Sequence, residues 1–122
     1  MLGITRGTAK KIFAGKTDKN QCTAWVNFDG TTTPPTIRDS FNVSSVVRNA
    51  VGNYTITFNT AMINVNYSVC AGGGYNNNGD GFDCDIFENL VTNTGFSIRT
   101  VNSNSTSALD YKLVNLHIFG GK

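Results

Sequence analysis

Charged residues are scarce in this chain of 122 residues. Only 15% of its residues are Asp, Glu, Lys or Arg, against about 25% in an average soluble domain. The net charge of +2 is too small to indicate nucleic acid as a partner, and no long Lys/Arg stripe with interleaved aromatic residues occurs. Polarity comes instead from Asn, Thr and Ser, which suit turns and strand surfaces better than helix interiors. The composition therefore favours a β-protein.

Long hydrophobic runs are also missing. No stretch approaches the roughly 18 apolar residues of a membrane span, so we expect no membrane insertion. Residues 1–11 contain no continuous apolar segment of about 7–15 residues, so they do not predict a signal peptide. We expect a soluble protein that is not exported by the ordinary route, and its length fits one domain.

Cysteine and histidine are too few to build a recognisable site. Cys22, Cys70 and Cys84 are odd in number and fit no zinc spacing, so we expect free thiols, with one incidental disulfide as the alternative. His117 is the only histidine, and no catalytic triad can be assembled around it from neighbouring motifs. We expect no enzyme, no cofactor and no metal. A His117 metal site on the three-fold axis of a trimer is the alternative.

Residues 76–81, Asn-Asn-Asn-Gly-Asp-Gly, match the opening of a calcium loop. Such a loop needs a bidentate Glu at its twelfth position, and Phe87 stands there. Asn-Gly and Asp-Gly are also strong hairpin-turn dipeptides, so a turn is the favoured interpretation. A calcium site built from Asp80, Asp83 and Asp85 is the alternative, because three carboxylates this close repel one another unless they are solvated.

Alternation of apolar and polar residues predicts strands along most of the chain. From residue 24 to residue 29, Ala24, Val26 and Phe28 share one face, and Asp29-Gly30 ends the strand. Two prolines make residues 31–36 a loop. Further strands are expected over 37–43, with Ile37, Phe41 and Val43 on one face, and over 54–58, 67–71, 96–101 and 109–119, with a turn at 49–53. Residues 82–91 favour a strand, with a short irregular segment as the alternative.

This spacing predicts an all-β fold of about seven or eight short strands, an antiparallel, jelly-roll-like β-sandwich over residues 22–122. The last strand carries apolar residues on both faces, including Leu113 and Phe119, which fits a central or intersubunit strand. Trp25 is a further candidate for core or oligomer packing. A sugar-stacking surface is the less favoured interpretation of the aromatic residues Trp25, Tyr54, Tyr67, Tyr75 and Tyr111.

Residues 1–21 differ from the rest of the chain. They contain five basic residues and one acid, with apolar islands too short to fold alone. Such a segment can add a strand to a partner or fill a groove on it. We expect an N-terminal arm that docks on another protein, with a frayed end as the alternative. The candidate docking residues are Arg6, Lys10, Lys11, Ile12 and Phe13.

Between residues 24 and 69 the chain contains, in order, the segments AWVNFDG, IRDSFNVSSV, GNYTITF, TAM and NYSV. This series closely resembles a β-domain of bacteriophage tail-fibre and other virion-surface proteins. The resemblance implies a non-enzymatic structural protein on the surface of the phage particle, made in the cytoplasm of the bacterial host and assembled as a homotrimer. It also implies another virion protein as the partner of the arm and a host surface glycan as a further partner.

Two roles compete within that class. The chain has no shaft, no heptads and no triple-β repeats, which favours a capsid decoration or protrusion protein, or a small appendage subunit. The alternative is a tail-fibre tip that binds the receptor. From a different class, a carbohydrate-binding module is the further alternative.

Overall fold

Eight strands and one short 3-10 helix form the described chain. The computed structural model describes residues 20–122, so the predicted docking residues Arg6, Lys10, Lys11, Ile12 and Phe13 lie outside the described residues. The strands are β1 (Cys22–Asp29), β2 (Thr36–Phe41), β3 (Val43–Ala50), β4 (Asn53–Phe58), β5 (Tyr67–Gly73), β6 (Phe82–Ile86), β7 (Gly95–Asn102) and β8 (Val114–Gly120), with the helix η1 (Glu88–Leu90) between β6 and β7.

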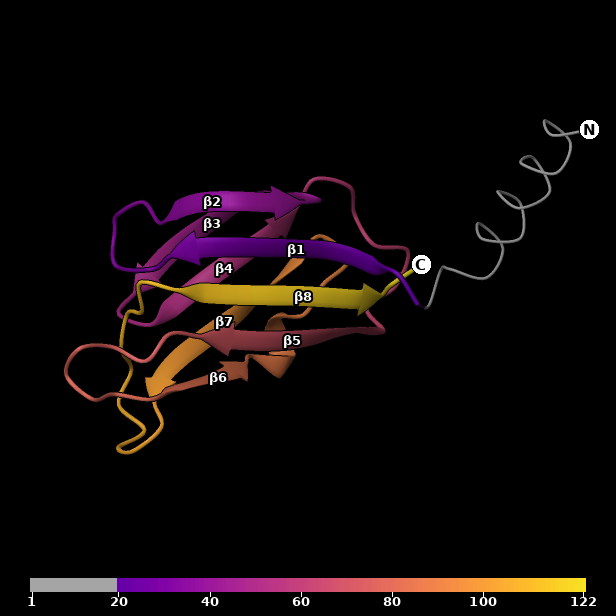
Figure 1. The fold of residues 1–122 in the computed structure, drawn as a ribbon. Helices are drawn as coiled ribbons and strands as arrows, with labels where there is room; N and C mark the ends of the chain where they lie inside the picture. Colours follow the sequence, from indigo (N-terminus) through magenta and orange to yellow (C-terminus); the bar gives the residue numbers. More distant parts are fainter. Residues whose placement is uncertain (1–19) are drawn as a thin grey trace, which may run out of the picture.

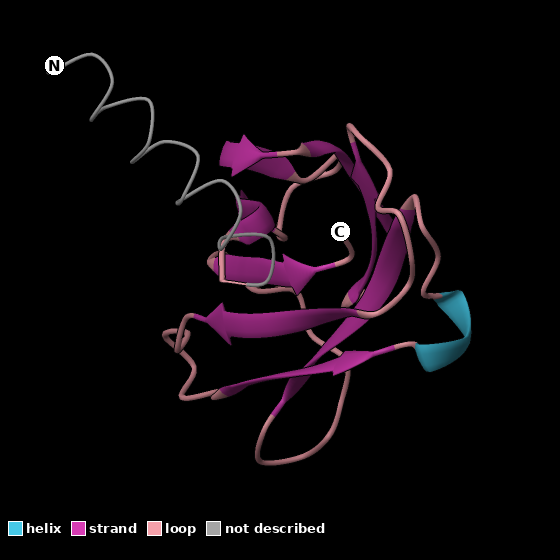
Figure 2. Cartoon of the chain, turned by 90° about the vertical axis from the view of Figure 1, so that its right-hand side faces the viewer, coloured by secondary structure: helices cyan, strands magenta, loops and turns pink. Residues whose placement is uncertain are grey.

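The strands form two four-stranded sheets packed face to face. The front sheet has the order β2-β1-β8-β5 and the back sheet the order β3-β4-β7-β6, and the two layers are seen in Figures 1 and 2. Every pairing is antiparallel. The predicted antiparallel β-sandwich is therefore confirmed. β8 lies between β1 and β5, so the last strand is central in its sheet as predicted, but its outer face, with His117 and Phe119, is exposed in the single chain.

The core lies between the sheets and is built from alternate residues of the strands. The inward faces predicted for residues 24–28 and 54–58 are confirmed, because their even-numbered side chains are buried. Edge-to-face contacts between aromatic rings, such as Phe28 with Tyr54 at a centroid distance of 5.2 Å, join the two sheets. No helix within residues 20–122 is long and apolar enough to cross a membrane.

The segment predicted as one strand over residues 37–43 is two strands that belong to different sheets. The break is at Asn42, whose φ of 54° turns the chain from the front sheet to the back sheet. A bulge in the pairing of β1 with β2 also reverses the alternation within β2. Ile37 therefore packs against the core while Phe41 is exposed, and the prediction that Ile37, Phe41 and Val43 share a face is wrong.

Two other predicted strands are shorter than expected. The segment 82–91 is a strand only to Ile86, and η1 follows. The last strand begins at Val114, because residues 109–113 carry the chain from the back sheet to the front sheet. Leu109 still bonds to the back sheet through its amide, which donates to the Thr100 carbonyl, while the Leu113 carbonyl accepts from Gly74, the residue that follows β5.

Candidate binding surface

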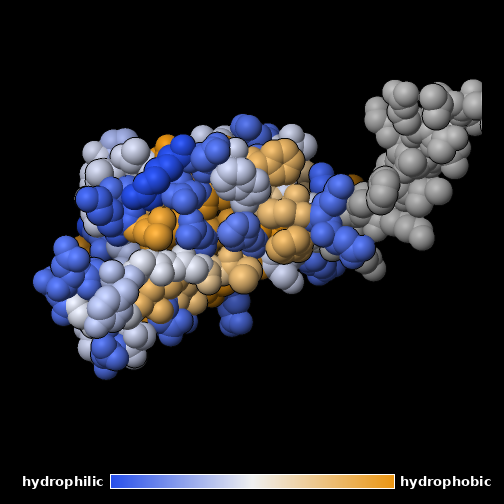
Figure 3. Space-filling model, in the orientation of Figure 1, coloured by the Kyte–Doolittle hydropathy of each residue, from blue (hydrophilic) through white to orange (hydrophobic). Residues whose placement is uncertain are grey.

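Three aromatic side chains lie together on the outer face of the front sheet. Strand register places Trp25 of β1 opposite Phe41 of β2 and opposite His117 of β8. Phe119 follows two residues later on the same face and is paired with Ser68 of β5. We call Trp25, Phe41 and Phe119 the outer aromatic patch. Phe41 is 52% exposed and Phe119 39%, and Figure 3 shows apolar side chains toward the end of this face at which the C-terminus lies.

A groove of about 470 Å³ adjoins this patch. We call it the corner groove, because it lies where the chain turns from the front sheet to the back sheet. The Phe41 ring is its large apolar wall, and amide, hydroxyl and ammonium groups supply most of the rest. Its lining residues are Gln21, Cys22, Thr23, Phe41, Asn42, Asn59, Thr60 and Lys122.

The Asn42 side chain fixes the shape of the corner groove. Its Nδ2 donates to the carbonyls of Thr23 and Thr60, both at 3.2 Å, and its Oδ1 accepts from the Thr60 amide at 2.7 Å. Asn tolerates the left-handed conformation found here better than most residues. The start of β1, the corner after β2 and the segment after β4 are thus held in one arrangement.

Several polar groups of the groove remain available for a ligand. The side chains of Gln21, Asn59 and Lys122 are exposed and make no hydrogen bond with any residue in the described range. The groove contains no carboxylate side chain. It therefore offers neutral donors and acceptors, one cation and one aromatic ring.

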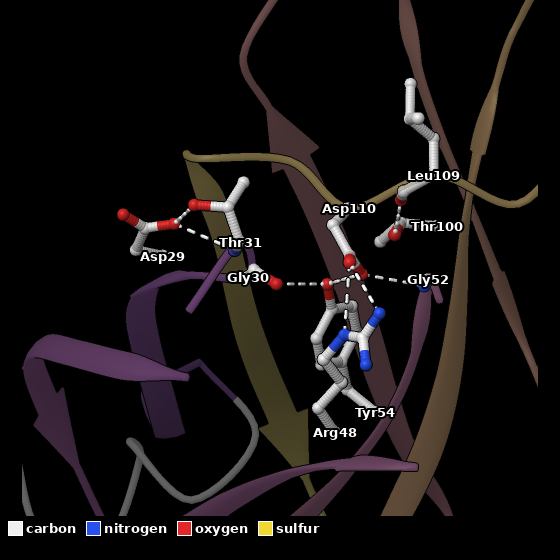
Figure 4. A network of polar contacts seen from close by, with 9 residues as sticks. All are labelled: Asp29, Gly30, Thr31, Arg48, Gly52, Tyr54, Thr100, Leu109 and Asp110. Carbon is white, nitrogen blue, oxygen red and sulfur yellow. Dashed lines mark hydrogen bonds and ion pairs between the residues drawn. The ribbon is translucent and has the colours of Figure 1, made fainter. Parts of the chain in front are cut away.

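A saturated polar network closes the opposite end of the sandwich (Figure 4). Arg48 donates to Asp110 Oδ2 through Nε at 3.0 Å and Nη2 at 2.9 Å. The Gly52 amide donates to Asp110 Oδ1 at 2.8 Å. The Tyr54 hydroxyl shares its proton between Asp110 Oδ1 at 2.5 Å and the Gly30 carbonyl at 2.8 Å.

These contacts shift the pKa values of Asp110 and Tyr54. Partial burial alone would raise the pKa of Asp110, but the hydrogen bonds from Arg48, Tyr54 and Gly52 outweigh it and hold that pKa below its ordinary value. Burial, and then the hydrogen bond to the Asp110 carboxylate, raise the pKa of Tyr54. Asp110 stays ionised, and hydrogen bonds occupy both of its oxygens. The carboxylate therefore holds its own segment against the β3–β4 hairpin, and neither oxygen is left to accept a substrate proton.

The Asn-Gly-Asp-Gly segment forms a self-contained turn between β5 and β6. Asn76 Oδ1 accepts from the amides of Asn78 and Asp80, and Asn76 Nδ2 donates to Asp80 at 2.9 Å. Asn102 donates to the other oxygen of Asp80. Asp83 and Asp85 are exposed on β6. Within residues 20–122, no three His, Cys, Asp or Glu side chains gather in a way that could hold a metal.

The residues predicted for core or oligomer packing all lie outside the core of the single chain. Trp25 is partly exposed on the outer face, Phe119 belongs to the same patch, and Leu113 is 40% exposed just before β8. Their role in contacts between chains stays a prediction. The three cysteines are free thiols.

The sequence pattern predicts Trp25 and Phe119 of the outer aromatic patch as packing candidates, but it places Phe41 on the wrong face. Of the other aromatic residues proposed to stack on sugar, Tyr54 and Tyr111 are buried in the core, and Tyr67 packs against Phe58 and Phe96. Tyr75 lies in the β5–β6 loop, 75% exposed. Phe41 and Phe119 join Trp25 through strand pairing, and no signal in the local sequence marks those neighbours.

Comparison with known proteins gives one structural likeness. No protein-family model matches the sequence, and a search of curated proteins gave no match. The fold resembles part of the phiAB6 tailspike, whose crystal structure contains three-repeated oligosaccharides of Acinetobacter baumannii surface polysaccharide. The TM-score is 0.56 at 16% identity, over 79% of this chain and 20% of the tailspike. The chain thus spans about a fifth of that protein's length, and the likeness is one of fold.

Proposed function

We propose that this chain is a non-enzymatic structural protein of a bacteriophage particle, displayed on the surface in a small tail appendage. The likeness to a tailspike over 79% of the chain is the observation that carries this proposal. It adds to the resemblance between residues 24–69 and virion-surface β-domains. Because the likeness is to a tail protein, it favours an appendage over a capsid decoration.

The use of polar side chains supports a non-enzymatic role. The most strongly interacting carboxylate, Asp110, has both oxygens occupied by Arg48, Tyr54 and a backbone amide. A general base needs an oxygen or nitrogen within reach of the proton that it removes. The exposed polar side chains of Gln21, Asn59 and Lys122 line a groove with the exposed ring of Phe41, an arrangement that suits contact with a partner.

Localisation on phage particles tests the proposal. Purified particles are labelled with an antibody against this protein and imaged by electron microscopy, with antibody that has been absorbed by the purified protein as the control. We expect label on the tail. Label on the capsid would contradict the appendage role, and particles without label would contradict the whole proposal.

We propose further that residues 1–21 attach the chain to another protein of the particle. Deleting residues 2–20 should leave the thermal midpoint of the sandwich almost unchanged, because β1 begins at Cys22, but should abolish incorporation into particles. Replacing Ile12 and Phe13 by Ala, against replacing Lys10 and Lys11 by Gln, separates apolar from ionic attachment. Normal loading of the deleted variant would assign the attachment to the β-domain.

A further inference from the structure

We propose that the corner groove is a binding site for a short neutral oligosaccharide. This inference deepens the proposed function by naming a class of ligand. It rests on that function only for the source of the glycan, which would be the surface of the bacterial host.

The size and shape of the groove suit a ligand of a few sugar rings. Its volume of about 470 Å³ lies within the range of about 300–1,000 Å³ found for small-molecule sites. The groove lies beside β2, an edge strand of the front sheet, so no neighbouring strand of that sheet covers this side of it.

The lining of the groove matches the two faces of a sugar. A pyranose ring presents C–H groups that pack on an aromatic face, and Phe41 presents a ring that is 52% exposed. The hydroxyl groups of the sugar need both donors and acceptors, and the side-chain amides of Gln21 and Asn59 supply both. Apart from Lys122, the polar side chains of the groove are neutral, so most of the hydrogen bonds that it offers suit uncharged hydroxyl groups.

The arrangement is formed before a ligand arrives. Asn42 makes three hydrogen bonds that tie the segments on either side of the groove. A site whose walls are already held loses less conformational entropy on binding. An apolar protein surface docked here would instead bury the free amides of Gln21 and Asn59 without partners, which costs free energy.

The chain contains its own reporter for this site. Trp25 is the only tryptophan, and it lies opposite Phe41 on the same face of the front sheet. A ligand that stacks on Phe41 changes the surroundings of the neighbouring indole. Tryptophan fluorescence should therefore follow occupancy of the groove without a label.

The test titrates the full chain with neutral di- and trisaccharides of glucose, galactose, mannose and N-acetylglucosamine, by calorimetry and Trp25 fluorescence. We expect at least one of them to bind with saturation. Phe41→Ala should weaken binding by about tenfold, and Asn59→Ala, which leaves the ring in place, should also weaken it. Tyr75→Ala removes an exposed ring outside the groove and should leave binding unchanged.

Three results would overturn the inference. The first is the absence of saturable binding across the whole panel. The second is an equal loss of binding in Tyr75→Ala and Phe41→Ala, because binding would then not depend on the groove. The third is self-association that Phe41→Ala abolishes, with no response to sugar, which would assign the groove to a second copy of the chain. Since purified protein is used, the outcome is independent of where the antibody labels the particle.

Discussion

Asp110 joins its own segment to the β3–β4 hairpin and, through Tyr54, to Gly30 after β1. Its carboxylate accepts from Arg48 near the end of β3, from Gly52 in the β3–β4 turn, and from Tyr54, which also contacts Gly30 after β1. Hydrogen bonds to an ionised group are stronger than neutral ones, and leaving such partners unpaired is costly. This one side chain therefore holds an end of the sandwich closed.

Replacing Asp110 by Ala should lower the free energy of unfolding by about 2–4 kcal/mol. The loss arises because Arg48 and Tyr54 would keep their partly buried positions without a partner. Urea unfolding followed by circular dichroism measures the difference. Asp85→Ala is the matched control, since the Asp85–Arg99 pair is long at 3.8 Å and exposed, and its loss should cost less than about 1 kcal/mol. Equal effects of the two variants would contradict the role given to Asp110.

The lowered pKa of Asp110 also predicts how stability changes in acid. A carboxylate whose pKa is lower in the folded protein than in the unfolded chain stabilises the fold above its unfolded pKa, and this contribution is lost as the pH falls through the folded pKa. Unfolding free energy should therefore decline as the pH drops below the ordinary value of 3.8. Asp110→Asn should lower stability at neutral pH and flatten this decline. An unchanged slope in that variant would assign the acid sensitivity to other groups, such as Asp29, whose pKa is also lowered.

The three thiols should differ in reactivity. Burial, and then the carboxylates of Asp85 and Asp83, raise the pKa of Cys84 to about 12, so little of the reactive thiolate forms. Cys70 is exposed on the outer face of the front sheet. Iodoacetamide at pH 8, followed by mass spectrometry of peptides, should modify Cys70 first and Cys84 only after unfolding. Modification of Cys84 in the folded protein at the rate of Cys70 would contradict this assignment.

At the scale of elements, the corner after β2 determines how the two sheets are joined. β2 belongs to the front sheet and β3 to the back sheet, and a single residue separates them. Asn42 combines a φ of 54° with side-chain hydrogen bonds to segments on both sides. The same corner forms one wall of the corner groove, so we expect its rigidity to affect ligand binding as well as folding.

Two substitutions separate the contributions of Asn42. Asn42→Gly keeps the backbone conformation at little cost but loses the amide hydrogen bonds, and should destabilise the protein by about 1–3 kcal/mol. Asn42→Ala loses the same bonds and also strains the backbone, and should cost about 1–2 kcal/mol more. Thermal unfolding measures both. Asn59→Ala, which removes an exposed amide, is the control with little effect. Equal losses in the Gly and Ala variants would show that backbone strain plays no part.

At the scale of the whole molecule, the outer face of the front sheet leaves large apolar side chains in water. Phe119 and Leu113 are each at least 39% exposed, and Trp25 lies on the same face. An exposed apolar patch on a small protein commonly marks an interaction site. We expect the homotrimer that the family resemblance implies to bury Trp25, Phe119 and Leu113, and to leave Phe41 and the corner groove open at its rim.

Light scattering coupled to size exclusion should give a mass of about three times 13.1 kDa if the homotrimer forms. Trp25→Ala should then lower stability by an amount that depends on protein concentration, because association stabilises the folded chain by mass action. Tyr75→Ala is the matched control, since Tyr75 lies in a loop outside the patch. A monomer at micromolar concentration would contradict the trimer.

The strands and their inward faces were predictable because alternation is a local property of extended backbone. In a strand, successive side chains point to opposite faces, so the pattern of residues 24–28 and 54–58 was enough to place Phe28, Tyr54 and Ile56 in the core. The turn at residues 76–81 was predictable for a similar reason, since Asn-Gly dipeptides favour tight turns in any context. These features need no information from distant parts of the chain.

Only the tertiary structure decided which outward-facing residues became neighbours. A bulge opposite β1 reversed the alternation within β2 and brought Phe41 beside Trp25, and a break at Asn42 separated two strands that the sequence pattern joined. Arg48 and Asp110 meet although their positions are 62 apart in the sequence. Register and sheet order depend on the packing of the whole core, which a local pattern does not contain. The proposed binding surface is a product of that packing, because its residues come from the start of β1, the corner after β2, the segment after β4 and the residue Lys122.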